Sequence, residues 1–361
     1  MESNEPKRPN SFKRLKQLID RQTIRLSDTA KAKTFRKNFI AGVLGQMIPD
    51  GAYLKGGSAI SLRYPLSESR VSRDIDTAYS GSEEEFEESF AKKLQEGWQG
   101  FAGSFEHAER KHTPAGIQLD TLSVHLDYMG IRFATINFEA SPDLGDHLPD
   151  AEYRMDNDMR EIFQSMGFDM APARMMDIDA QLAEKLNGLS RENRNGKDLY
   201  DIETIMRHHT PDLGLLRDNS RIAERRDQGH DTKIIPDSKK AEYLATYTRA
   251  GGRNKEQCWT LAQRLLSEVD LDCSDEWHEY WGENAPLLED SADLAEAEQA
   301  ETDRIRSEQM RAAAKRIAAG IPEPGGEIHV DSYRKADGTV VRGYTSETFA
   351  LKAACNPLAD D

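Results

Sequence analysis

The stretch Lys55-Gly56-Gly57-Ser58, followed by Arg70-Val71-Ser72-Arg73-Asp74-Ile75-Asp76, decides how the rest of the chain is interpreted. A short apolar strand is expected just before it, at residues 52–54. A helix is expected just after it, at residues 59–64, with Ser58 as N-cap. Two glycines let the backbone approach a ligand closely, and the free N–H groups at a helix start suit a phosphate. The pattern therefore predicts a phosphate-binding turn between a strand and a helix.

Asp74 and Asp76 lie in a second predicted strand, where side chains two residues apart point to the same face. Two carboxylates can hold one or two Mg²⁺ (or Mn²⁺) ions, which prefer oxygen ligands. A phosphate cradle beside a metal-binding pair is what nucleotidyl transfer from an NTP requires. A glycine pair or a DxD pair alone is common on protein surfaces, so the inference depends on their combination in this order.

Hydrophobic periodicity predicts the elements around this centre. Helices are expected at residues 11–47, 82–98, 176–189, 197–208, 239–250, 255–269 and 292–319. Alternating apolar residues predict a hairpin of strands at 117–126 and 131–138, and Asp337-Gly338 predicts a second hairpin near the end of the chain. The expected fold class is α+β (or α/β), with a small mixed sheet carrying Asp74 and Asp76 and a helical C-terminal region.

Composition excludes several classes of protein. The chain has 361 residues, of which 37% are hydrophobic and 31% charged, and no apolar run approaches the roughly 20 residues of a membrane helix. The first residues lack the apolar region of a secretory signal. Three cysteines, Cys258, Cys273 and Cys355, form neither a disulfide framework nor a CxxC motif. We expect a cytoplasmic protein that is neither fibrous nor membrane-bound.

Charge is distributed unevenly along the chain, although the net value is -16. Residues 1–45 hold eleven Lys/Arg and four Asp/Glu, a net charge of +7, whereas residues 267–303 hold fourteen Asp/Glu and no Lys or Arg. The basic segment is either a contact for a polyanion such as RNA or the solvated face of an amphipathic helix. The acidic block either covers a basic groove, repels unwanted ligands or is simply solvated.

Four motifs occur in a recognisable order: KGGSAISLRY at 55–64, RVSRDID at 70–76, AEKLNGLSREN at 183–193 and KDLYDIETI at 197–205. Together they resemble the AbiEii family of nucleotidyltransferase toxins, which includes the mycobacterial MenT toxins. The resemblance covers residues 35–207 and implies a minimal polymerase-beta-like nucleotidyltransferase core. On this basis we expect four parts: a basic N-terminal helical segment (1–34), the core (35–145), a helical part completing the active site (146–235), and a helical extension with the acidic block and the terminal hairpin (236–361).

The resemblance also implies roles for individual residues. The catalytic candidates are Asp74, Asp76, Lys185, Asp198 and Asp201, of which Asp74 and Asp76 would bind the metal. The nucleotide-binding candidates are Lys55, Gly56, Gly57, Ser58 and Ser72. Ser72 is also a possible control point, because a modification that adds negative charge there would repel the triphosphate.

Three roles stay open at this point. Without the family context Lys185 would be an ordinary surface lysine on an amphipathic helix. Asp198 and Asp201 are three residues apart on a helix and share a face, so spacing does not say which of them acts. Glu139, on the returning strand of the first hairpin, is either a third carboxylate of the site or a solvent-facing strand residue.

The activity implied by the resemblance is transfer of an NMP from an NTP to RNA. The acceptor would be the tRNA 3′ end, so that translation is blocked within a toxin–antitoxin or abortive-infection system, with a cognate antitoxin as partner. The loop bearing Arg191, Arg194 and Lys197 is either an RNA contact or solvated. The alternatives are a nucleotidyltransferase for a small molecule such as an antibiotic, and a catalytically idle regulatory binding protein.

Overall fold

The computed structural model describes residues 6–26, 29–108, 111–112, 118–144, 147, 149–191, 196–226 and 230–270, together with four short strands between 328 and 346. The chain divides into two compact units, residues 1–294 and 295–361. The second unit contributes two antiparallel pairs, β9 (Ile328–Val330) with β12 (Tyr344–Ser346) and β10 (Tyr333–Arg334) with β11 (Val340–Val341). The sheet and helices that carry the candidate site residues all belong to the first unit.

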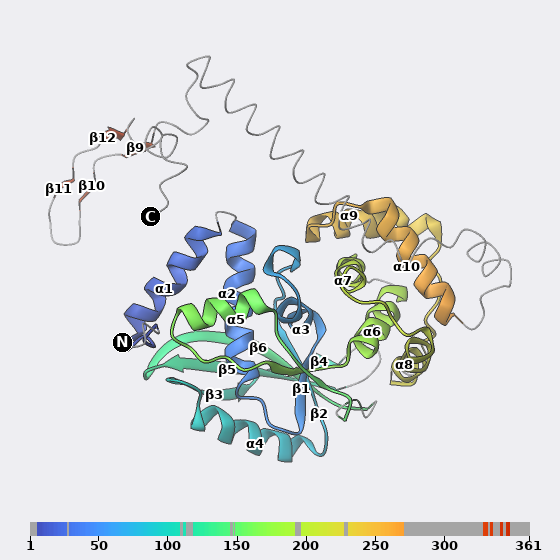
Figure 1. Ribbon diagram of the computed structural model, residues 1–361, viewed down its shortest axis with the longest axis horizontal. Coiled ribbons are helices and arrows are strands. Elements are labelled where there is room, and N and C mark those ends of the chain that lie inside the picture. The colour runs from blue at the N-terminus through green and yellow to red at the C-terminus, as the bar shows by residue number, and fades with distance from the viewer. Residues whose placement is uncertain are drawn as a thin grey trace, which may run out of the picture. The chain divides into compact units, whose positions relative to one another are not determined.

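A mixed sheet forms the centre of the first unit (Figure 1), with the strand order β3-β5-β6-β2-β1-β8-β7 and β4 paired to β5. Its strands are β1 (Ala52–Lys55), β2 (Ile75–Tyr79), β3 (Phe101–His107), β4 (Lys111–His112), β5 (Gln118–Tyr128), β6 (Ile131–Pro142), β7 (Glu152–Arg154) and β8 (Ala173–Met175). In the middle of the sheet β2 runs antiparallel to β1 and parallel to β6. This register places Lys55 opposite Asp76 and Asp76 opposite Glu139.

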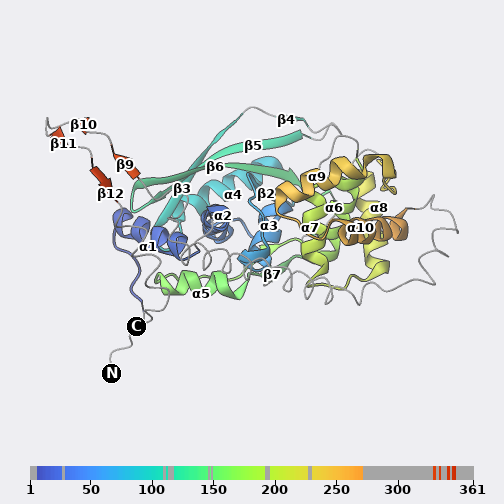
Figure 2. The same ribbon diagram turned by 90° about the horizontal axis from the view of Figure 1, so that it is seen from above.

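Helices accompany the sheet in two groups. The first group is α1 (Phe12–Arg25), α2 (Thr29–Gly45), α3 (Gly56–Arg63), α4 (Glu83–Glu96) and α5 (Asn157–Ser165). The second is α6 (Ile178–Ser190), α7 (Lys197–Met206), α8 (Leu213–Arg226), α9 (Lys240–Ala250) and α10 (Lys255–Val269). Figures 1 and 2 both show the second group gathered at one side of the sheet, beyond β1 and β2.

One face of the sheet is covered by helices and packs with aromatic side chains. Phe39 of α2 stacks on Phe163 of α5 with ring centroids 4.6 Å apart, and also contacts Phe101 of β3. Phe90 of α4 stacks on Phe138 of β6. Because side chains alternate along a strand, burying Phe138 sends its neighbours Asn137 and Glu139 to the opposite face of the sheet.

The second helical group has a hydrophobic core of its own. Leu182 and Leu186 of α6, Ile202 of α7 and Leu265 of α10 belong to this cluster. Helix α3 takes part in both cores: Ala59 and Leu62 belong to the first, and Ile60 and Tyr64 belong to the second. The helix that follows the glycine turn is therefore held between the sheet and the helical group.

Most of the predicted elements are confirmed. The hairpin forms from β5 and β6, and Met129 (φ 50°) and Gly130 (φ 77°) make its turn. The helix expected at 82–98 appears as α4, which begins at a capping box formed by Ser82 and Glu85. The helices expected at 176–189, 197–208, 239–250 and 255–269 appear as α6, α7, α9 and α10, and the terminal hairpin pairs as expected.

Two predictions were wrong in detail. The single helix expected at 11–47 is two helices, α1 and α2. Helix α3 begins at Gly56 with Lys55 at its N-cap position, so Ser58 lies inside the helix and does not cap it. Elements not anticipated are α5, α8, β3, β4, β7 and β8. The helix expected at 292–319 lies outside the described residues, and the four-part division of the chain stays a prediction.

No helix in the described ranges combines the length and apolar character that crossing a bilayer requires.

Candidate active site

The turn between β1 and α3 is built around Gly56. Its φ of +65° lies in the left-handed region, and a Cβ added there would lie 2.1 Å from Oδ2 of Asp76. At Gly57 an added Cβ would lie 2.9 Å from Nη2 of Arg70 and 3.3 Å from Oγ of Ser72. The start of α3 is therefore in close contact with two other parts of the chain. These are the carboxylate of Asp76 and the segment that carries Arg70 and Ser72. Glycine is needed there because a side chain at position 56 would collide with Asp76 and one at position 57 would press against Arg70.

Replacing Gly56 with alanine should therefore damage both stability and activity. The new methyl group would meet Asp76 and the backbone would be strained, so we expect a loss of unfolding free energy of more than about 1 kcal/mol. Gly130 is the matched control: its φ is +77°, but an added Cβ would have nothing within 4 Å. Denaturant unfolding and transfer assays on both variants test this, and a Gly56→Ala protein that behaves like Gly130→Ala would contradict it.

Three carboxylates lie near one another, with Asp76 opposite Glu139 on β2 and β6 and Asp74 just before β2. Asp74 precedes β2 and accepts a hydrogen bond from Nδ2 of Asn137 at 3.2 Å. Burial raises the pKa of Asp76 to about 6, and the charge of Glu139 strengthens this effect, while Lys185 and Lys55 oppose it. Glu139 therefore acts electrostatically on the site, which favours its interpretation as a site carboxylate.

The donor set fits a hard divalent cation. Within the described ranges no three His, Cys, Asp or Glu side chains converge as a ready-made metal centre. Mg²⁺ rarely uses such a cage, because it is usually held by one or two carboxylates, with substrate phosphates and water completing the shell. Asp74 and Asp76 supply that pair. The raised pKa of Asp76 reflects burial first and the charge of Glu139 second, and a cation bound beside the carboxylate would offset both.

Lys185 of α6 is buried within a cluster of charges, so it is not a surface lysine. Its Nζ lies 2.9 Å from Oδ1 of Asp198 and 2.8 Å from Oδ2 of Asp201, and its side chain is 12% exposed. Although burial disfavours its charge, the two carboxylates raise the pKa of Lys185 above its ordinary value. The lysine therefore stays protonated at neutral pH beside the glycine turn.

The surroundings of Asp198 and Asp201 differ, which sequence spacing did not reveal. Asp201 receives two hydrogen bonds from Arg70, Nε to Oδ1 at 2.7 Å and Nη2 to Oδ2 at 2.6 Å, and its side chain is 2% exposed. Burial opposes its charge, but Arg70 and Lys185 hold the pKa of Asp201 below its ordinary value. Asp201 is thus enclosed by two cations, whereas Asp198 is more exposed and is paired with Lys185.

Helices α6 and α7 also fix the neighbouring backbone. Nε2 of the buried Gln181 donates to the carbonyl of Gly56 at 2.8 Å. On α7, Oη of Tyr200 donates to the carbonyl of Glu68 at 2.9 Å, two residues before Arg70. Sequence reasoning assigned no role to Gln181 or Arg70. Their partners are 125 and 131 residues away, so no local pattern marks them.

The remaining predicted site residues fall into two groups. Ser72 lies in the site, where its Oγ donates to the carbonyl of Asp74 at 3.0 Å, and Ser58 is buried in α3. Arg191 donates to Oδ1 of Asn187 at 3.1 Å, and Lys197 is the first residue of α7. Arg194 lies outside the described residues. Their assignment to RNA stays a prediction.

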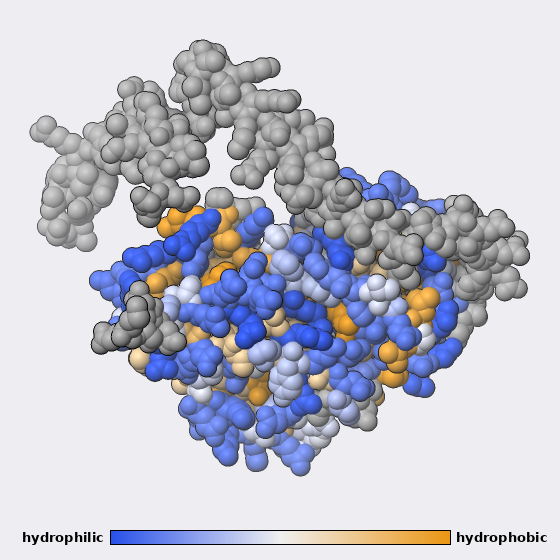
Figure 3. Space-filling model, in the orientation of Figure 1, coloured by the Kyte–Doolittle hydropathy of each residue, from blue (hydrophilic) through white to orange (hydrophobic). Residues whose placement is uncertain are grey.

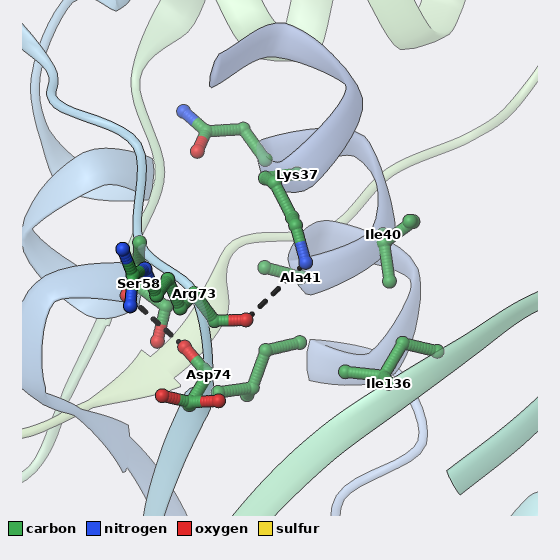
Figure 4. A pocket seen from close by; sticks show the side chains of 10 residues that line it. Lys37, Ile40, Ala41, Ser58, Arg73, Asp74 and Ile136 are labelled. Carbon is green, nitrogen blue, oxygen red and sulfur yellow. Dashed lines mark hydrogen bonds between the residues drawn. The ribbon is translucent and has the colours of Figure 1, made fainter. Parts of the chain in front are cut away.

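A small pocket opens beside Asp74 on the side of α2 (Figure 4). Ile40 and Ile136 line its apolar part, and Ser72 and Asp74 contribute polar groups. Nζ of Lys37 donates to the carbonyl of Arg73 at 3.2 Å at this pocket. The carboxylates of the site are thereby connected to the exposed surface of α2.

Comparison with known proteins identifies the family and the fold. A family model described as the nucleotidyl transferase AbiEii toxin of type IV toxin–antitoxin systems matches residues 48–337. Among solved structures, MenT4, a nucleotidyltransferase toxin from Mycobacterium tuberculosis H37Rv, is similar in fold: the TM-score is 0.50 at 16% identity, covering 77% of this chain and 98% of that one. No curated protein gives a significant match. The chain therefore belongs to the AbiEii family of nucleotidyltransferase toxins.

Proposed function

We propose that this nucleotidyltransferase transfers an NMP from an NTP to RNA, with the 3′ end of tRNA as acceptor, and thereby blocks translation. The observation that carries the proposal is the convergence of the glycine turn, Asp76 and the charge cluster of Lys185 at one place. Membership of a toxin–antitoxin family implies an NTP as substrate and a cognate antitoxin as partner.

Each side chain has a task that follows from its position. The N–H groups that begin α3 would bind the triphosphate, with Lys55 adjacent to them. Lys185 has three N–H donors, two of which are used by Asp198 and Asp201, so one can be directed to a phosphate oxygen. We assign Asp198 as the catalytic aspartate and Asp201 as the residue that positions Lys185 and Arg70.

Asp74 and Asp76, assisted by Glu139, would hold Mg²⁺. When bound, this ion would neutralise the triphosphate and the leaving pyrophosphate. Asn137 keeps the carboxylate of Asp74 in place through its hydrogen bond. Gln181 holds the carbonyl of Gly56, which keeps the glycine turn open toward the phosphates.

A transfer assay tests the proposal and separates it from its rivals. The purified protein is incubated with Mg²⁺, each labelled NTP in turn and total RNA, and the label is then located. We expect label at the 3′ end of tRNA and none after chelation of the metal. Label on a small hydroxyl compound would identify a small-molecule enzyme instead, and a complete absence of transfer with every acceptor would indicate an idle binding protein.

Growth provides an independent test. Expression of the wild-type protein in a bacterial host should arrest growth, whereas the Asp74→Ala variant, which loses a metal ligand, should leave growth unaffected. Equal amounts of both proteins must be verified in the soluble fraction. Arrest by both variants would mean that toxicity does not depend on catalysis.

A further inference from the structure

Helices α1 and α2, with the segment before them, concentrate positive charge. The described residues 6–26 and 29–45 contain eleven lysines and arginines and a single acidic residue, Asp20, which gives +10. Since the whole chain carries -16, the remaining residues carry -26. This excess of positive charge on α1 and α2, in a chain that is otherwise acidic, creates a positive electrostatic potential over the surface of these two helices.

The two helices join their charges into one continuous face. On α2, Lys33, Arg36 and Lys37 are exposed and lie three and four residues apart, so they share one side of the helix. Nη2 of Arg36 lies 2.8 Å from Oδ1 of Asp20, which ties this side to one flank of α1. At about 3.6 residues per turn, Lys16 lies on the same flank as Asp20. Lys16, Lys33, Arg36 and Lys37, called here the lysine face, therefore lie on the adjoining sides of α1 and α2, which meet at the ion pair of Arg36 with Asp20.

The lysine face ends at the active site. Lys37 contacts the carbonyl of Arg73, the residue before Asp74, and both line the pocket in Figure 4. Arg73 is itself exposed and adds one more cation at this end. In Figure 3 hydrophilic residues cover α1 at the upper left. A polyanion bound along the lysine face would thus be directed toward the carboxylates of the sheet.

We infer that the lysine face binds the phosphodiester backbone of the RNA acceptor and guides its 3′ end to Asp74 and Asp76. The inference rests on the proposed function and specifies where its acceptor is held. A protein partner fits this face less well, because cores of protein interfaces are depleted in lysine, whereas lysines suit phosphates. The contacts are to the backbone, so they set affinity and register and carry no base preference.

The salt dependence of RNA binding tests the inference. The triple variant Lys16→Ala/Lys33→Ala/Lys37→Ala removes three cations from the lysine face. Arg14, Arg21 and Arg25 lie on the opposite flank of α1 and are equally exposed. Their triple alanine variant is therefore the matched control: it has the same net charge and leaves the lysine face intact. Binding of total tRNA to full-length protein is measured without NTP at several salt concentrations.

Loss of three phosphate contacts should lower the log–log salt slope by about 2.7, at roughly 0.9 per contact. Between 50 and 200 mM salt, wild-type affinity should then fall about 40-fold more than that of the lysine-face variant. The control should keep the wild-type slope. Equal salt slopes for the lysine-face variant and wild type would overturn the inference. If the transfer assay still places label on RNA, the proposed function stands and only the lysine face is excluded as the RNA contact. Loss of inhibition by antitoxin with an unchanged RNA slope would also overturn it and assign the face to protein binding.

Discussion

Replacement of Asp76 by asparagine is expected to reduce nucleotidyl transfer by about 10³-fold or more while leaving the fold intact. The loss follows because the substitution removes a carboxylate that would hold the metal ion. A bound metal ion stabilises the charge of the transition state by several kcal/mol. Stability should not fall, because burial and, after it, the charges of Glu139 and Asp74 raise the pKa of Asp76 and so disfavour its ionised form in the folded protein. We therefore expect an unchanged or higher melting temperature together with lost activity.

The control for this variant is Asp158→Asn, an exposed aspartate in the first turn of α5. It should retain both wild-type transfer and wild-type melting. Thermal melting and the labelled-NTP assay are performed on the same preparations. An Asp76→Asn protein with wild-type transfer would refute the metal-binding assignment, and one that is inactive because it is unfolded would refute the claim that Asp76 contributes nothing to stability.

The second large effect concerns Asp201, whose replacement by asparagine should destabilise the protein by about 3–5 kcal/mol. Breaking a buried ion pair leaves its partners charged and desolvated, and Asp201 pairs with both Arg70 and Lys185. Asp198→Asn should cost only about 1 kcal/mol, because Lys185 keeps its contact with Asp201. Both variants should lose transfer, but only Asp198→Asn should do so while remaining well folded.

Denaturant unfolding of both variants decides between the two aspartates. A double-mutant cycle sharpens the test: Arg70→Gln alone should also be costly, and Arg70→Gln/Asp201→Asn should cost less than the sum of the single changes. Additive costs would mean that Arg70 and Asp201 do not stabilise each other. An Asp201→Asn protein as stable as wild type would contradict the positioning role directly.

Sequence reasoning worked where the chemistry is local. The strand, the glycine turn and the Asp74–Asp76 pair all lie within residues 52–76, and the apolar alternation of 117–126 and 131–138 predicted the hairpin that carries Glu139. The hairpin turn at Met129 and Gly130 followed from its neighbours for the same reason. Such features depend on backbone conformations that a few adjacent residues determine.

Other features depended on contacts that no local pattern carries. The role of Arg70 is fixed by Asp201, 131 residues away, and the carbonyl of Gly56 is held by Gln181, 125 residues away. Helix α5 is short and was not anticipated; it is stabilised largely by Phe163 stacking on Phe39.

The active site is assembled from distant parts of the chain, and this affects the protein during its synthesis. The metal-binding candidates are residues 74 and 76, but Lys185 comes from α6 and its partners Asp198 and Asp201 come from α7, and these helices end at residues 190 and 206. A ribosome exposes the chain from its N-terminus, so the carboxylates emerge first. The nascent chain therefore lacks Lys185 and its partner Asp201 until more than half of the chain has left the ribosome. Before that point the active site is incomplete, so the ribosome that makes the protein is not exposed to an active enzyme.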